Sequence, residues 1–76
     1  MKNNINPTII KYRVEYVSGL FRKIFVYNYD EILIGELECF GNFYSNEEEI
    51  QNWLDENEQD LFGRNVDSYN FVNITE

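Results

Sequence analysis

The stretch from Ser45 to Gly63 limits the possible folds most, because it has the periodicity of an α-helix. Ser45 and Glu48 match a capping box, in which a hydroxyl and a carboxylate satisfy backbone amides of the first helical turn. Gly63 suits the left-handed residue that often ends a helix. Between these caps a narrow, mostly apolar stripe recurs at helical spacing, formed by Ile50, Trp53, Leu54, Asn57 and Leu61. This stripe has to be buried against another part of the chain.

Four other segments have features typical of β-strands. Residues 8–17 alternate between apolar and charged side chains, and residues 20–27 follow a turn at Ser18-Gly19. Residues 31–40 and 66–75 complete the set. The pattern predicts an α+β fold in the order β-β-β-α-β, with one amphipathic α-helix on one face of an antiparallel sheet of three to four strands.

The length of 76 residues leaves room for one core only. Residues 1–7 are polar and are predicted to form a flexible tail, which leaves residues 8–76 as a single domain. The chain has one cysteine, Cys39, and no histidine. An intramolecular disulfide and the usual zinc sites are therefore excluded.

The turn at Ser18-Gly19 also suggests which strand faces are buried. A two-residue loop there would pair Tyr16 with Phe21 and Tyr12 with Phe25. It would then place an apolar patch on the sheet face opposite Tyr12, formed by Ile24, Val26, Ile32 and Ile34. Because one helix covers one sheet face, this patch would either be exposed or be crossed by the tail or the C-terminal segment; both alternatives are open.

Catalysis has little support in the sequence. Acid–base chemistry near neutral pH most often uses histidine, which is lacking, and Cys39 has no histidine to activate it. Glu36 and Glu38 could form a glycosidase-like pair or a Mg²⁺ site, but a solvated strand face is the commoner arrangement. An EF-hand loop from Asp55 would need glycine at Asp60 and glutamate at Val66. We expect no enzyme, no cofactor and no metal.

Charge is distributed unevenly along the chain, whose net charge is −8. Residues 1–27 contain five basic residues and one acid, whereas residues 28–76 contain thirteen acids and one arginine. Direct binding of nucleic acid through the acidic part is disfavoured, because phosphate contacts need lysine or arginine. The sequence has neither an apolar leader nor an apolar run long enough to span a membrane, which predicts a cytoplasmic protein.

The acids of the helix are expected to lie on both sides of its apolar stripe. Glu47, Glu48 and Glu49 complement the positive end of the helix dipole. Four further acids have no such explanation in helix stability: Asp55, Glu56, Glu58 and Asp60. They are either a solubilising surface or a surface that docks on a basic site of another protein.

The docking hypothesis predicts a small inhibitor or modulator that occupies the basic nucleic-acid-binding groove of a partner protein. In size and acidity the chain is similar in type to phage-encoded anti-CRISPR proteins and DNA mimics, although no motif links it to one family. The alternative is a homodimeric structural or accessory subunit that uses the exposed apolar sheet face. The candidate binding residues are carboxylates with three flanking aromatic side chains: Glu36, Glu38, Glu48, Glu49, Asp55, Glu56, Glu58, Asp60, Tyr29, Phe43 and Tyr44.

Overall fold

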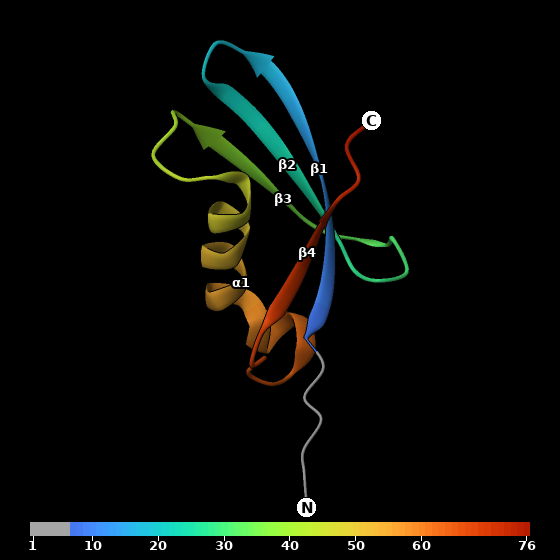
Figure 1. Ribbon diagram of the computed structural model, residues 1–76. Coiled ribbons are helices and arrows are strands. Elements are labelled where there is room, and N and C mark those ends of the chain that lie inside the picture. The colour runs from blue at the N-terminus through green and yellow to red at the C-terminus, as the bar shows by residue number, and fades with distance from the viewer. Residues whose placement is uncertain (1–6) are drawn as a thin grey trace, which may run out of the picture.

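A computed structural model describes residues 7–76 and shows an α+β fold with one sheet and one helix (Figure 1). The predicted order β-β-β-α-β is confirmed. Six of the seven residues of the predicted tail lie outside the described part. The elements are β1 (Thr8–Ser18), β2 (Phe21–Tyr27), β3 (Leu33–Phe40), α1 (Asn46–Phe62) and β4 (Tyr69–Asn73).

The sheet is mixed, so the prediction of a purely antiparallel sheet is wrong. Its strand order is β3-β2-β1-β4, and β4 pairs with β1 in parallel. The reason lies in the connection through α1. The helix returns the chain to the end of the sheet where β3 began, so β4 runs in the same direction as β3 and β1. Beyond β4, the Ile74 amide donates to the Tyr12 carbonyl, which extends the cover of the edge of β1.

The pairing of β1 with β2 differs by one residue from the predicted register. Tyr12 lies opposite Val26, and Tyr16 lies opposite Arg22, because β1 contains a bulge between Tyr16 and Ser18. One extra residue in one strand reverses the faces of all the residues that follow. Ile24 and Val26 consequently share the helix-covered face with Tyr12 and are fully buried.

The predicted apolar patch on the second sheet face is therefore wrong: Ile34 also packs against the core, and Ile32 alone of the four is exposed, in the loop before β3. In place of Ile24 and Val26, this second face, which no helix or strand of residues 7–76 covers and which we call the uncovered face, contains basic and aromatic side chains. The Arg13 guanidinium lies 4.3 Å from the centre of the Phe25 ring. Phe21 stacks on Phe40 with their ring centres 4.6 Å apart. The homodimer hypothesis thus loses the interface on which it was based.

The helix begins and ends as its cap residues predict. The Glu48 amide donates to the Ser45 hydroxyl, and the Ser45 amide donates to the Glu48 carboxylate. Gly63 has a positive φ of 71°, and its amide donates to the Gln59 carbonyl. Ile50 and Leu54 on α1 are fully buried against the sheet, so the apolar stripe holds α1 on one face.

Candidate functional site

A hollow of about 380 Å³ lies along the edge of β3 beside α1, and four of the predicted binding residues line it. We call it the acidic groove. Its acids come from two elements: Glu36 and Glu38 from β3, and Glu49 and Glu56 from α1. Glu49 and Glu56 are seven positions apart, which is two helical turns, so both face β3. Leu37, Cys39, Asn52 and Trp53 complete the lining.

The four groove carboxylates differ in how far basic residues neutralise them. Glu49 lies 3.9 Å from Arg22, and Glu36 lies 3.8 Å from Lys23. Within residues 7–76, Glu38 and Glu56 have no ion-pair partner. Both side chains are exposed. The groove therefore keeps a net negative charge and can attract cations by long-range electrostatics.

The wall of the groove is built by close packing between the two elements. Trp53 rests on Gly35, and a Cβ at that position would overlap its ring. Cys39 beside it is buried, and burial raises the pKa of its thiol, with the Glu49 carboxylate acting in the same direction. A thiol with a raised pKa is a poor nucleophile, so Cys39 is suited to packing rather than to catalysis.

The carboxylates on the other flank of α1 have partners inside the protein. Glu47 accepts a hydrogen bond of 3.0 Å from the Tyr12 hydroxyl. Glu58 accepts one of 3.0 Å from the Tyr69 hydroxyl and one of 2.9 Å from the Val66 amide. The interpretation of Glu58 as an acid without a structural explanation is wrong, because this carboxylate ties β4 and the preceding loop to the helix.

The other predicted helix acids lie outside the lining of the acidic groove. Glu48 belongs to the capping box, and the pKa of its carboxyl is lowered, first by the hydrogen bond that it accepts from the Ser45 amide and then by its interaction with the Ser45 side chain. Asp55 accepts a hydrogen bond from the Gln51 side chain. Asp60 is exposed in the last turn of α1. These acids add to the charge of the helix surface without forming part of the groove.

The three predicted aromatic anchors lie at two different ends of β3 (Figure 1). Tyr29 lies in the loop before β3, where Lys11 approaches its ring. Phe43 and Tyr44 lie in the loop after β3, and Phe43 is 92% exposed. Since a strand of eight residues is roughly 25 Å long, Tyr29 cannot contact the same small site as the other two.

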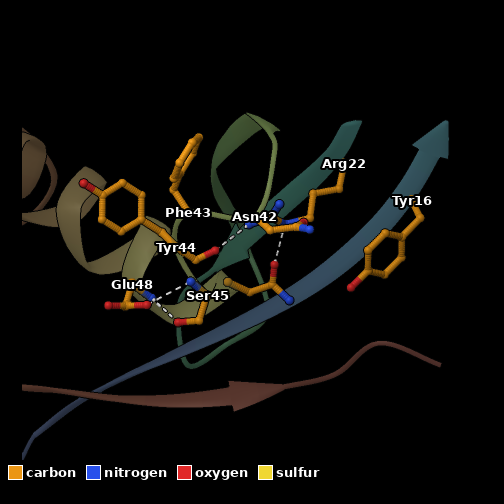
Figure 2. A pocket seen from close by; sticks show the side chains of 8 residues that line it. Tyr16, Arg22, Asn42, Phe43, Tyr44, Ser45 and Glu48 are labelled. Atoms are coloured by element: carbon orange, nitrogen blue, oxygen red, sulfur yellow. Dashed lines mark hydrogen bonds between the residues drawn. The ribbon is translucent and has the colours of Figure 1, made fainter. Parts of the chain in front are cut away.

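Phe43 and Tyr44 belong to an exposed group of large side chains that we call the aromatic end, together with Tyr16, Leu20 and Phe40. A second hollow of about 490 Å³ lies here, with Phe43 and Tyr44 on one side and Tyr16 on the other (Figure 2). Glu48 lines this hollow, and its neighbour Glu49 lines the acidic groove. Acidic and aromatic surfaces thus adjoin at the first turn of α1.

The sequence did not indicate the residue that positions both hollows, Arg22. The hydrogen bonds of its buried guanidinium fix the β3–α1 loop, as Figure 2 shows in part. Nε donates to Asn46 at 2.6 Å, and the two Nη atoms donate to the carbonyls of Gly41 at 2.8 Å and Tyr44 at 3.1 Å. The apolar side chains of residues 20–27 predicted only a strand, and nothing local to Arg22 indicated that it would be buried.

The tyrosines that donate to Glu47 and Glu58 should make stability depend on alkaline pH. Burial, followed by these hydrogen bonds, raises the pKa of Tyr12 and of Tyr69 from 10.0 to about 12. The unfolded chain therefore loses these protons first, so their contribution is complete below pH 10 and disappears as the pH rises towards 12. We expect the free energy of unfolding, measured with urea, to fall across this interval.

The matched control replaces both tyrosines with phenylalanine. This double variant should be less stable at neutral pH, by about 1 kcal/mol for each lost hydrogen bond, and should lose less stability between pH 10 and 12 than the unchanged protein. Parallel pH profiles for the two proteins would contradict the assignment.

Within the described residues, no group of three or more histidine, cysteine, aspartate or glutamate side chains is arranged to hold a metal ion. No helix in that part of the chain is both long and apolar enough to cross a membrane. Comparisons with protein-family models, with curated proteins and with solved structures found no match. The geometry of the acidic groove and the aromatic end is therefore the basis for a functional proposal.

Proposed function

We propose that this protein binds, in the cytoplasm, a basic surface of another protein that normally holds nucleic-acid phosphates, and so inhibits or modulates that partner. The observation that carries the proposal is that Glu36 and Glu38 of β3 and Glu49 and Glu56 of α1 line one groove along the edge of the sheet. Carboxylates spaced along two adjacent elements offer a row of negative charge to lysine and arginine. This is the charge pattern that a phosphate-binding surface accepts.

The aromatic end supplies the binding affinity that charged contacts alone do not supply. Charged contacts at an interface increase the association rate and the specificity, whereas buried aromatic anchors usually contribute most of the affinity. Phe43 and Tyr44 are exposed beside the end of the groove. In this proposal the groove orients the partner, and the rings of Phe43 and Tyr44 insert into the surface of the partner.

The test compares variants that lose the same charge at different places. Glu38→Gln with Glu56→Gln neutralises the two groove acids that form no ion pair within the described part of the chain, and Asp30→Asn with Asp67→Asn neutralises two exposed loop acids. Each tagged protein is used to capture partners from a lysate of the source cells at low salt. Glu58 is left unchanged, since its loss would weaken the fold.

We expect the groove variant to bind the captured partner at least about tenfold more weakly than the loop variant, a difference of about 1.4 kcal/mol. Binding of the unchanged protein should weaken steeply with salt, and added duplex DNA should displace the partner. Equal affinity of the two variants, or a complex that DNA does not displace, would overturn the proposal.

A further inference from the structure

Among residues 7–76, the edge of β3 that faces away from β2 is the longest strand edge without a pairing partner, and we call it the free edge. β3 has eight residues and stands at the end of the strand order, whereas β4 at the other end has five. The C-terminal segment also covers β1 beyond β4, where the Val14 amide donates to the Thr75 hydroxyl. Natural proteins rarely leave such an edge unprotected, because its backbone groups can pair with another chain.

The pairing with β2 shows which backbone groups of β3 face outward. The Gly41 amide donates to the Leu20 carbonyl, so Phe21 and Phe40 form a pair without direct hydrogen bonds between them. The backbone groups of successive residues in a strand point to opposite edges. The amides and carbonyls of Leu37 and Cys39 therefore bond to β2, whereas those of Glu36 and Glu38 point to the open edge of β3. Among the described residues, no other segment donates to or accepts from these outward groups.

The acidic groove runs along this edge and defines which strand would fit. A strand paired with β3 would place alternate side chains beside Glu36 and Glu38, on the uncovered sheet face. Its remaining side chains would face Glu49 and Glu56 across the groove. Opposite charges in such cross-strand positions stabilise the pairing. The edge therefore favours an extended segment with lysine or arginine on both faces.

The same charges disfavour a second copy of this chain as the occupant. In an antiparallel pair of β3 strands related by two-fold symmetry, Glu36 and Glu38 of the two copies would lie opposite or next to each other. Like charges in directly opposite positions destabilise a sheet. Charge complementarity thus selects a basic partner strand over self-association.

We propose that the partner contributes an extended, basic segment that pairs with the free edge of β3 and adds a fifth strand to the sheet. This inference rests on the proposed function and specifies how the partner is held. Backbone hydrogen bonds supply affinity that does not depend on side chains, and the groove acids select for lysine and arginine.

The test uses a fluorescent synthetic peptide of repeating Lys-Lys-Val-Val as the probe, because this pattern places lysine on both faces of an extended strand. Glu38→Pro removes the outward amide of Glu38, and proline is tolerated where an edge amide faces solvent. Glu38→Gln is the matched control, because it removes the same charge and keeps the amide. We expect Glu38→Pro to bind the peptide at least about tenfold more weakly than Glu38→Gln, and the peptide to protect the amides of Glu36 and Glu38 from hydrogen exchange.

A second arm leaves the protein unchanged and so does not depend on the folding of the proline variant. A peptide of the same sequence with every backbone nitrogen methylated keeps its charge but has no amide to donate from either edge, so it cannot complete the strand pairing. It should bind at least about tenfold more weakly than the unmodified peptide. Equal affinity of the two peptides, or of the two Glu38 variants, would overturn the inference.

These outcomes separate the edge inference from the proposed function. If partner capture still depends on the groove acids but Glu38→Pro behaves like Glu38→Gln, the groove acts through side chains alone and the edge inference fails. If capture does not depend on the groove acids, the proposed function fails. A dimer in sedimentation that Glu38→Pro converts to a monomer would show that a second copy occupies the edge, and would also overturn the inference.

Discussion

Replacement of Arg22 by methionine is expected to lower the free energy of unfolding by about 3–5 kcal/mol. Arg22 is 6% exposed, and its guanidinium donates hydrogen bonds to Asn46, Gly41 and Tyr44. Methionine fills a similar volume but leaves these acceptors without their charged donor, and it leaves Glu49 without its cation. Unfolding in urea, followed by circular dichroism, measures the loss.

Two further substitutions show whether this loss of stability comes from the hydrogen-bond network of Arg22 or from its charge. Arg22→Lys keeps the charge but lacks the planar fork that reaches three acceptors, so it should lose most of the same stability. Lys23→Met alters the next residue, which lies on the uncovered face and forms a partly exposed ion pair with Glu36. That change should cost less than about 1 kcal/mol. A fully stable Arg22→Lys protein would show that charge alone, rather than the network, fixes the loop.

The helix could be predicted from the sequence because its signals are local. The Ser45–Glu48 capping box, the apolar stripe and Gly63 all act within a few residues of one another, and the structure has the helix bounds they indicate. The two flanks of acids follow from the same geometry. Glu47 and Glu58 contact β1 and β4, whereas Glu49 and Glu56 face β3.

The sheet could be predicted only in part, because its faces depend on bulges. One irregularity between Tyr16 and Ser18 moved Ile24 and Val26 from the second face into the core. Another between Val26 and Tyr27 shifts the pairing so that Leu33 lies opposite Tyr27 and is exposed. A bulge adds one residue and leaves the apolar pattern of each strand unchanged, so the sequence alternation contains little sign of it.

The candidate site was predicted as a list of acids, but the sequence could not divide that list by role. The role of each acid depends on whether a residue far away in the chain forms a hydrogen bond or an ion pair with it. Glu58 has Tyr69 and Val66, and Glu49 has Arg22, whereas Glu38 and Glu56 have no ion-pair partner within residues 7–76. Acids without an internal partner contribute little to stability, so they can be changed without loss of the fold, which makes them the suitable residues for functional tests.

Substitution of Gly35 by alanine is expected to lower the free energy of unfolding by about 2–3 kcal/mol. The added Cβ would overlap the ring of Trp53, which forms part of the groove. The ring has to move or α1 has to shift away from β3, and either change alters the groove as well as the stability. Urea unfolding measures the cost, and the tryptophan fluorescence should shift to longer wavelength as the ring becomes more exposed.

A double-mutant cycle with Trp53→Leu determines whether this contact is the cause. Leucine does not extend over Gly35 as the indole does, so Gly35→Ala should cost less than about 1 kcal/mol in the Trp53→Leu background, a coupling of at least about 1 kcal/mol. An equal cost in both backgrounds would place the strain in the backbone of β3 instead. With the coupling present, Gly35 is the position that sets the distance between α1 and β3, and therefore the width of the acidic groove into which a partner's lysine or arginine would have to fit.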